Sequence, residues 1–294
     1  MANILAVGIA TLDIVNTVAD YPNQDDEIRA INQNHSRGGN ATNTLAILSQ
    51  LRHSCYWAGT LVHETDTQLI LNDLDEFKID YSYVDFLTQG KIPTSYITLN
   101  QKNASRTIIH YRDLPEYSFQ SFQKIPLDKF DWIHFEGRNT EEMSKMLRYC
   151  RNTAPHLKVS LEIEKIRDNI EILFEFADLL MFSKSYARSA GFNSAIDFLE
   201  KLPSNLQSKY ITCTWGKDGA SLLYDGKICS SPAYPITGIV NTLAAGDTFN
   251  AAIIDSTLRE LPPQQCLNNA CRLAAQKCTF ETLKFIDKIT LLSM

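Results

Sequence analysis

The segment Asn241-Thr242-Leu243-Ala244-Ala245-Gly246-Asp247-Thr248-Phe249-Asn250 places small residues directly before an apolar, helix-forming stretch. Amide groups in the first turn of a helix lack intrahelical acceptors and lie at the positive end of the helix dipole. Small side chains leave these amides open to an anion. Asp247 falls in the same turn, where a carboxylate has two possible uses. It can cap the helix, or it can take the proton of a hydroxyl that attacks a phosphate held by the neighbouring amides.

A second glycine-rich segment, Gly38-Gly39-Asn40-Ala41-Thr42-Asn43, leads into another predicted helix, over residues 41–51. Paired glycines permit backbone angles that other residues avoid. Asn40 and Asn43 are three residues apart and can present their amides to one ligand. A glycine turn followed by an asparagine cap accounts for the same pattern.

An apolar run over residues 4–9 predicts a central parallel strand early in the chain. Asp13 follows this run, and open α/β sheets place ligand-binding groups at the carboxyl ends of their strands. Asp13 is therefore a candidate ligand group, although an ordinary residue at a strand end has the same position.

Predicted strands and helices then alternate, which favours a mostly parallel, right-handed α/β sheet. Residues 92–100 and 105–111 are β-rich and predict a hairpin. With an exposed polar strand at 27–35, the hairpin is expected to form a small sheet outside the main one. The other predicted strands are 54–59, 132–135, 158–163, 179–182 and 210–215, followed by short strands to 234, and the other predicted helices are 66–77, 140–151, 170–177, 194–201, 248–259 and 263–278.

The composition argues against several classes of protein. The 294-residue chain has a formal net charge of −6 and no cluster of Lys and Arg, so nucleic acid is not an expected partner. Its apolar start is too short for a membrane span, so no membrane partner is expected. Seven cysteines without a CxxC pair, after a start that does not resemble a signal peptide, predict a cytoplasmic location.

Several common site motifs are absent from the sequence. The six histidines show no metal-ligand spacing, and no direct side-chain metal ligand is predicted. No GxxxxGK[ST] is present, which disfavours a P-loop kinase. No GxGxxG follows the first predicted strand, which disfavours a dinucleotide-dependent dehydrogenase.

Asp13, the Gly-Gly-Asn turn and the 241–250 segment, in this order, resemble the signature of the ribokinase (PfkB) family of carbohydrate kinases. The resemblance runs from about residue 4 to residue 280 and is strongest to the family's ketohexokinase (fructokinase) branch. The segments that carry this closer resemblance are Asp20-Tyr21-Pro22, Asp26-Glu27-Ile28-Arg29, Arg37-Gly38-Gly39-Asn40-Ala41, Ser105-Arg106-Thr107-Ile108, Trp132-Ile133-His134-Phe135-Glu136-Gly137-Arg138-Asn139 and Val240-Asn241-Thr242-Leu243.

The resemblance implies a three-layer, ribokinase-like α/β fold, in which helices flank a mostly parallel sheet and a small β-sheet forms a lid. The nucleotide- and sugar-binding domain would comprise residues 1–10, 38–90 and 114–294. The lid would be discontinuous and comprise residues 11–37 and 91–113.

The resemblance also implies a role for each matching residue. Asp247 matches the general base, and the backbone amides of Ala244, Ala245 and Gly246 match an anion hole for the transferring phosphoryl group. The sugar-binding positions are Asp13, Asp25, Gly39, Asn40 and Asn43. The nucleotide-binding positions are Arg106, Gly216, Lys217, Asp218, Gly219 and Cys278. Each nucleotide-binding position also has an explanation without a ligand. Arg106 can be a surface charge on the lid, residues 216–219 can be a plain hairpin turn, and the helix that ends at Cys278 can owe its sequence to apolar packing.

The implied activity is transfer of the γ-phosphate of ATP to a sugar hydroxyl, with fructose or another ketohexose, phosphorylated at C1, as the expected acceptor. Another sugar, a sugar acid or a nucleoside is the alternative acceptor. ATP and Mg²⁺ are the implied cofactors, and K⁺ is a further candidate. A homodimer that associates through its lids is expected, because the exposed face of a small sheet needs cover.

Two departures from the family pattern bear on this activity. Ala244 replaces the first glycine of the motif, and Asn241 replaces the acidic residue that opens it. If position 244 needs a positive φ, alanine there costs on the order of 1 kcal/mol. These changes motivate a second alternative, a catalytically impaired protein that binds sugar or nucleotide. Charged residues that follow predicted strands can pair with one another, approach Mg–ATP or be solvated; they are Glu136, Arg138, Glu162, Glu164 and Lys165.

Overall fold

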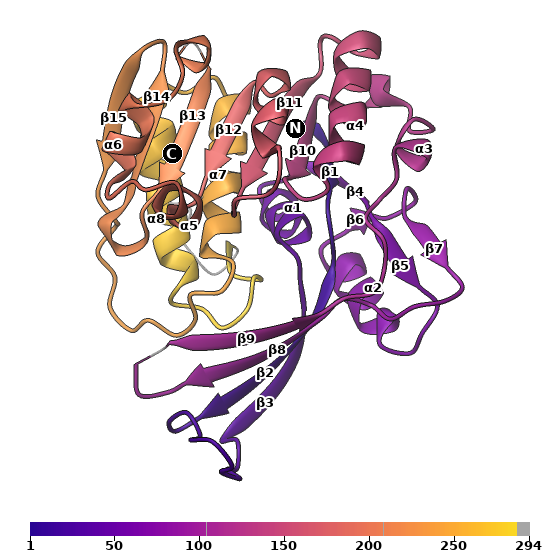
Figure 1. Ribbon diagram of the computed structural model, residues 1–294, viewed down its shortest axis with the longest axis vertical. Helices are drawn as coiled ribbons and strands as arrows, with labels where there is room; N and C mark the ends of the chain where they lie inside the picture. Colours follow the sequence, from indigo (N-terminus) through magenta and orange to yellow (C-terminus); the bar gives the residue numbers. More distant parts are fainter. Residues whose placement is uncertain (104, 208, 287–294) are drawn as a thin grey trace.

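The computed structural model describes residues 1–103, 105–207 and 209–286 (Figure 1). Its largest element is a nine-stranded sheet, in which β13, β14 and β15 pair antiparallel and all other neighbours pair parallel. In spatial order the strands are β15 (Lys227–Ser231), β14 (Ala220–Tyr224), β13 (Tyr210–Thr214), β12 (Leu179–Phe182), β11 (Lys158–Ile163), β10 (Trp132–Glu136), β1 (Asn3–Val7), β4 (Ser54–Ala58) and β6 (Ile79–Asp80).

Helices cover both faces of this sheet, which gives three layers (Figure 1). One face packs against α1 (Asn40–Gln50), α2 (Thr67–Glu76), α7 (Ala245–Leu258) and α8 (Pro263–Lys277). The other packs against α3 (Phe119–Phe122), α4 (Thr140–Thr153), α5 (Lys184–Ser189) and α6 (Ala195–Glu200). Alternate residues of β1 enter the two cores, because side chains of a strand point to opposite faces. Ile4 and Ala6 lie in the first core, and Leu5 and Val7 in the second.

A separate four-stranded sheet lies beside the start of α1 and below the start of α7 and the end of α8 (Figure 1). Its order is β3 (Asn32–Gly38), β2 (Thr11–Val18), β8 (Thr94–Asn100) and β9 (Arg106–Tyr111). The 92–100 and 105–111 hairpin is therefore present, as predicted. The strand expected at 27–35 begins later, at Asn32.

The position expected for Asp13 was wrong in one respect. The first strand ends at Val7, and Asp13 lies inside β2, which pairs with β3 and β8 in the small sheet. Alternate residues of β2 face a cleft between this sheet and the main body: Asp13, Val15 and Thr17. Asp13 thus reaches the cleft from the small sheet, through the two-residue period of a strand.

The remaining regular elements are short. β5 (Thr60–Val62) and β7 (Asp85–Leu87) form a two-stranded parallel sheet. The helix predicted over residues 170–177 is a 3₁₀ helix at Ile170–Phe176, and shorter 3₁₀ turns occur at Leu127–Lys129, Ser204–Leu206 and Gly216–Asp218.

Candidate active site

The first turns of α1 and α7 meet at the cleft. α1 follows Gly39, whose φ of 106° and ψ of 123° turn the chain out of β3 and into the helix. Asn43, in the first turn of α1, donates a hydrogen bond from Nδ2 to Oδ2 of Asp247 in the first turn of α7, at 2.8 Å. Both residues are buried, with exposed fractions of 9% and 6%. The two sequence segments that predicted ligand-binding turns are thus directly bonded to each other.

The start of α7 has the features of an anion site. Ala244, the residue before the helix, has a φ of 60° and a ψ of 14°, and no side chain caps the helix. The interpretation of Asp247 as a helix cap is therefore wrong: Asp247 lies three residues beyond Ala244 and accepts from Asn43 instead. The Ala245 amide makes a long bond of 3.4 Å, to the carbonyl of Thr242. A methyl group added at Gly246 would meet no atom within 4 Å, so the space above this turn is open.

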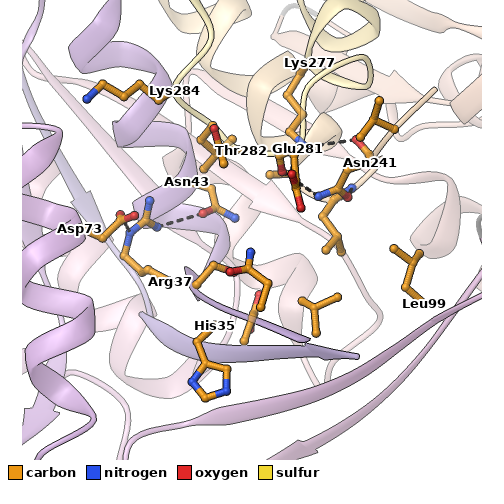
Figure 2. Close-up of a pocket in the computed structure, with 18 of the residues that line it drawn as sticks. His35, Arg37, Asn43, Asp73, Leu99, Asn241, Lys277, Glu281, Thr282 and Lys284 are labelled. Carbon is orange, nitrogen blue, oxygen red and sulfur yellow. Dashed lines mark hydrogen bonds and ion pairs between the residues drawn. The ribbon is translucent and has the colours of Figure 1, made fainter. Parts of the chain in front are cut away.

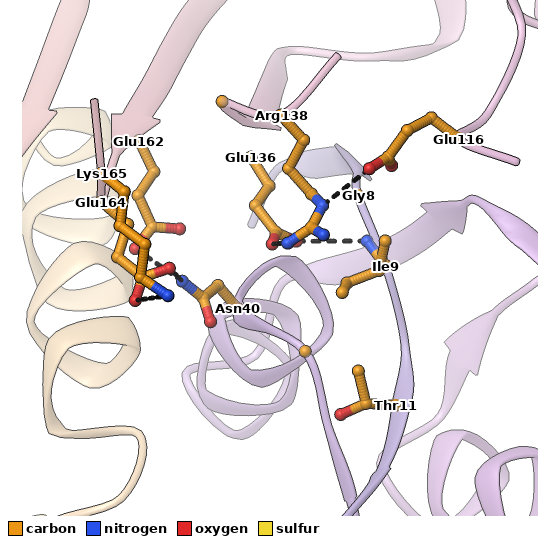
Figure 3. A network of polar contacts seen from close by, with 12 residues as sticks. Gly8, Ile9, Thr11, Asn40, Glu116, Glu136, Arg138, Glu162, Glu164 and Lys165 are labelled. Atoms are coloured by element: carbon orange, nitrogen blue, oxygen red, sulfur yellow. Dashed lines mark hydrogen bonds and ion pairs between the residues drawn. The ribbon is translucent and has the colours of Figure 1, made fainter. Parts of the chain in front are cut away.

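The asparagine-cap interpretation of the other turn also fails. Gly39 precedes α1, and no side chain caps that helix. Asn40 directs its amide nitrogen away, to Oε1 of Glu162 at 3.2 Å and Oε2 of Glu164 at 3.5 Å (Figure 3).

Because Ala244 occupies the left-handed region, replacing it with glycine is expected to stabilise the protein. Alanine in this conformation costs about 1–2 kcal/mol, and the greater freedom of glycine in the unfolded chain takes back about 0.4–1 kcal/mol. Ala244→Gly should therefore raise the free energy of unfolding, measured by urea denaturation, by roughly 0.5–1 kcal/mol. Ala245→Gly is the matched control: its φ is not positive, so it should lower stability by up to about 1 kcal/mol. A less stable Ala244→Gly protein would contradict the strain argument.

Carboxyl groups surround Asp247 and perturb its ionisation. Burial is the main cause that raises the pKa of Asp247, to about 7, and the negative charges of Glu136 and Glu164 add to it. The hydrogen bond from Asn43 and the charge of Arg37 act in the opposite direction. Burial and Asp247 itself also raise the pKa of Glu162 well above its usual value. A carboxyl group with a pKa near neutrality is suited to accept a proton at physiological pH.

Glu136 belongs to a chain of polar contacts on the other side of this cluster. Its Oε2 accepts from the amide of Ile9 at 3.1 Å, and its Oε1 accepts from Arg138 at 3.1 Å (Figure 3). Arg138 also bonds Glu116 at 2.9 Å. The pair of Glu136 and Arg138 considered from the sequence is therefore present.

With Asp247 as the base that the family resemblance implies, its raised pKa predicts an activity that appears as pH rises through about 7, because only the ionised carboxylate can accept a proton. Glu164→Gln removes a negative charge that raises this pKa, so the acidic limb of the kcat/KM profile should move to lower pH. Glu164 has a side chain that is 42% exposed, so the change should not disturb packing. Glu175→Gln, at another exposed carboxylate, is the control. A limb that stays in place or moves upward in Glu164→Gln would refute the prediction.

A cleft of about 760 Å³ opens between the small sheet, α2, the 239–244 segment and the chain after α8 (Figure 2). Three predicted site residues line it: Asp13, Asn43 and Ala244. Oδ1 of Asp13 accepts from the Thr11 hydroxyl at 2.8 Å, and burial raises the pKa of Asp13. The cleft therefore connects the small sheet with the starts of both helices.

The 239–244 segment is held on two sides. Arg106, the first residue of β9, donates to the hydroxyl of Thr242 at 2.9 Å and so joins the small sheet to this segment. Lys277, at the end of α8, is buried and donates to the carbonyl of Asn241 at 3.1 Å (Figure 2). Burial lowers the pKa of Lys277 to about 8. The carbonyl of Cys278 accepts from the amides of Val240 and Asn241.

The other predicted site residues, Asp247 included, are not among the residues that line this cleft. Asp25 is exposed on the loop between β2 and β3 and has a φ of 66°. Gly216, Lys217 and Asp218 form a 3₁₀ turn that ends at Gly219, beyond β13. Asp218 pairs there with Lys184 at 3.8 Å. The roles of these residues remain predictions.

Two residues were not among the candidates and yet lie at the site. Arg37 lines the cleft and donates to Asn43 at 2.9 Å. Lys277 lines it as well. Arg37 could have been predicted from its position beside the Gly-Gly-Asn turn. Lys277 could not, because a lysine in an amphipathic helix is expected to be solvated.

Comparison with known proteins identifies the class. The pattern of the family described as pfkB family carbohydrate kinase matches residues 1–283, so the chain belongs to this family and is a carbohydrate kinase. Mouse ketohexokinase is 38% identical to it over 284 residues, which are 94% of this chain and 95% of the mouse protein. Ribokinase of Bacillus subtilis strain 168 is 23% identical over 95% of this chain and 94% of that protein.

Solved structures confirm the ribokinase-like fold. The structure of Arabidopsis thaliana ribokinase complexed with ribose and ATP has a TM-score of 0.79, with 18% identity, over 96% of this chain and 94% of that chain. Ribokinase from Giardia lamblia has a TM-score of 0.82, with 15% identity, over 96% and 95% of the two chains. Among the described residues, no helix has both the length and the apolar character needed to cross a membrane.

Proposed function

We propose that this carbohydrate kinase transfers the γ-phosphate of ATP to a ketohexose, with the C1 hydroxyl of fructose as acceptor and Asp247 as general base. The similarity to mouse ketohexokinase supports the choice of acceptor. The hydrogen bond between Asn43 and Asp247 carries the choice of base, because it fixes a buried carboxylate between two helix starts, directly behind Asn43, which lines the cleft.

The sugar would bind between the small sheet and α1. Asp13 and the amides of Asn40 and Asn43 are the groups proposed to bind its hydroxyls, since carboxylates and amides pair well with a polyol. An acceptor hydroxyl near Asp247 would pass its proton to this carboxylate while its oxygen attacks the γ-phosphorus in line. The Pγ–O bond to ADP breaks as the new P–O bond forms.

The phosphoryl group would bind at the start of α7. The open space above Gly246 leaves room for it, and the amides of 244–246 would oppose the charge that develops in the transition state. Arg106 would reach the phosphates from the small sheet when this sheet closes as a lid, and closure would exclude water.

Sugar kinases of this family use ATP, generally with Mg²⁺, which bridges phosphate oxygens and neutralises their charge. In the described ranges, no group of three or more His, Cys, Asp or Glu side chains could hold a metal ion. Mg²⁺ usually keeps several waters and binds through substrate phosphates with one or two carboxylates, so we expect phosphate oxygens and water to supply most of its ligands here. K⁺ remains a candidate, and assays in K⁺ and Na⁺ buffers would test it.

A panel of acceptors with ATP tests the proposed substrate. Purified protein should phosphorylate fructose with a higher kcat/KM than ribose, a sugar acid or a nucleoside. A higher kcat/KM with another acceptor would refute fructose as the substrate, while the protein would still be a carbohydrate kinase. The impaired alternative is less favoured, because Ala244 adopts the left-handed conformation available to glycine and α7 begins normally after it. Fructose binding without turnover of ATP by the wild type would revive that alternative.

A homodimer through the small sheets is also part of the proposal. Four large apolar residues of β8 and β9 are exposed: Tyr96, Ile108, Ile109 and Tyr111. An exposed sheet of this kind is usually covered by another surface. Sedimentation at micromolar concentration should find a dimer, and a monomer would refute this part of the proposal.

A further inference from the structure

Arg37 connects four elements of the structure at the site. It is the second-last residue of β3, and its side chain is fully buried. Its Nε donates to Oδ1 of Asp73 on α2 at 2.5 Å. Its Nη1 donates to Oδ1 of Asn43 at 2.9 Å (Figure 2) and to the hydroxyl of Thr42 at 2.7 Å, both on α1. Asn43 in turn reaches Asp247 on α7.

These contacts determine which way the side-chain amide of Asn43 faces. Its oxygen meets the guanidinium of Arg37, and its nitrogen meets the carboxylate of Asp247. Rotating the amide by half a turn would place oxygen against carboxylate and N–H donors against N–H donors, which removes both hydrogen bonds. Because arginine can only donate, its presence leaves Asn43 one favourable orientation, with a donor aimed at Asp247.

We propose that Arg37 is a positioning residue for phosphoryl transfer: it acts on Asp247 through Asn43, and Asp73 holds it in place. This inference rests on the proposed role of Asp247 as the base. Arg37 lies near the end of β3, a strand of the small sheet, so it also links this sheet to the carboxylate of Asp247.

The charge of Arg37 has a second effect at the site. Its guanidinium lowers the pKa of both Asp247 and Asp13, in opposition to their burial. Nη2 is buried and has no hydrogen-bond partner among the described residues. The other charged groups that act electrostatically with Asp247 are the cation Lys277 and the carboxylates Glu136, Glu162 and Glu164.

Two substitutions separate geometry from charge. Arg37→Lys keeps the positive charge but cannot bind Asp73, Thr42 and Asn43 together, because it lacks the fork of the guanidinium. It should lower kcat by about 10- to 100-fold, as expected for a misplaced catalytic group, with little movement of the acidic limb of the pH profile. Arg37→Met should lower kcat similarly and also move that limb to higher pH, because the cation that favours ionised Asp247 is gone.

A double-mutant cycle tests whether Arg37 acts through Asn43. If it does, Arg37→Lys should reduce kcat far less in an Asn43→Ala background than in the wild type. Equal fold losses in both backgrounds would show that Arg37 acts independently of Asn43 and would overturn the proposal. Circular dichroism and thermal melts of every variant would establish that the compared proteins are folded.

Asp73→Asn tests the same proposal if the Arg37 variants do not fold. Asp73 holds Arg37 in place and is only partly buried, so its substitution should disturb folding less. It should lower kcat in the same direction and lose this effect in the Asn43→Ala background. Asp75→Asn, an exposed neighbour on α2 with the same charge change, is the matched control and should retain the wild-type rate. An Asp73→Asn enzyme that matches this control would also refute the proposal.

An active Asp247→Asn enzyme would instead refute the role of Asp247 as the base. The failure of the positioning role of Arg37 and the failure of the proposed base are therefore distinguishable.

Discussion

Asp247→Asn should lower kcat for phosphoryl transfer by about 10³-fold, because it removes the proposed proton acceptor and keeps the shape of the side chain. The amide oxygen of the new residue can still accept the hydrogen bond from Asn43, whose nitrogen lies 2.8 Å from Oδ2 of Asp247 in the wild type. Sugar binding, followed by calorimetry, should therefore change much less than kcat. Single-turnover assays with saturating ATP and acceptor would measure the chemical step directly.

A second buried aspartate on the same helix provides the control. Asp255 is 2% exposed, and its Oδ1 pairs with His53 at 3.0 Å and with Arg259 at 3.1 Å, a contact that involves neither Asn43 nor the first turn of α7. Asp255→Asn should lower stability, since it removes the charge of a buried carboxylate that pairs with Arg259, but should leave kcat close to that of the wild type. If Asp247→Asn retained more than about a tenth of the wild-type kcat, general-base catalysis by this residue would be refuted.

The sequence predicted the elements whose evidence is local. The strands at 158–163 and 179–182 have the bounds that were predicted. Residues 179–182 are continuously apolar, as expected of a strand buried on both faces, and residues 158–163 alternate polar and apolar side chains with the period of a strand. The two small-residue turns were also identified, since glycine before a helix start is a local signal. That the two turns belong to one site was expected only through the family resemblance, and the hydrogen bond between Asn43 and Asp247 was not predicted.

Other features depend on contacts between distant parts of the chain and were not predicted. Asp13 was assigned to the end of the first strand, yet β2 is set by its pairing with residues as distant as 94–100. The burial of Lys277 depends on the 239–244 segment, more than 30 residues earlier, which covers the end of α8. The conformation of Ala244 was left open, because alanine carries no signal for a left-handed backbone.

The burial of the carboxylates near Asp247 also could not be predicted from the sequence. Glu162 and Glu164 were recognised as charges after a strand, but solvation remained an explanation. Glu162 proves to be 7% exposed, and its Oε2 has no hydrogen-bond partner among the described residues. Burial depends on how α1 and α7 pack over the strand ends, which no local pattern in 158–165 encodes.

Gly39→Ala should be the most destabilising single methyl addition at the site. The φ of 106° at Gly39 lies outside the conformations that alanine readily adopts, and the added Cβ would lie 2.1 Å from the carbonyl oxygen of Ile9. The first effect costs about 1–2 kcal/mol, and forcing the backbone apart adds about 1–3 kcal/mol. The free energy of unfolding, measured by urea denaturation, should therefore fall by roughly 2–5 kcal/mol.

Gly191→Ala isolates the conformational part of this loss. Gly191 has a φ of 93°, close to that of Gly39, but no atom lies within 4 Å of its added methyl group. It should lose only about 1–2 kcal/mol and keep its KM for the acceptor. Gly39→Ala should raise that KM as well, because relief of the overlap with Ile9 must displace the start of α1, and with it Asn40 and Asn43. Equal losses of stability in the two variants, with KM unchanged in both, would mean that the close approach of Gly39 to Ile9 has no role in shaping the sugar site.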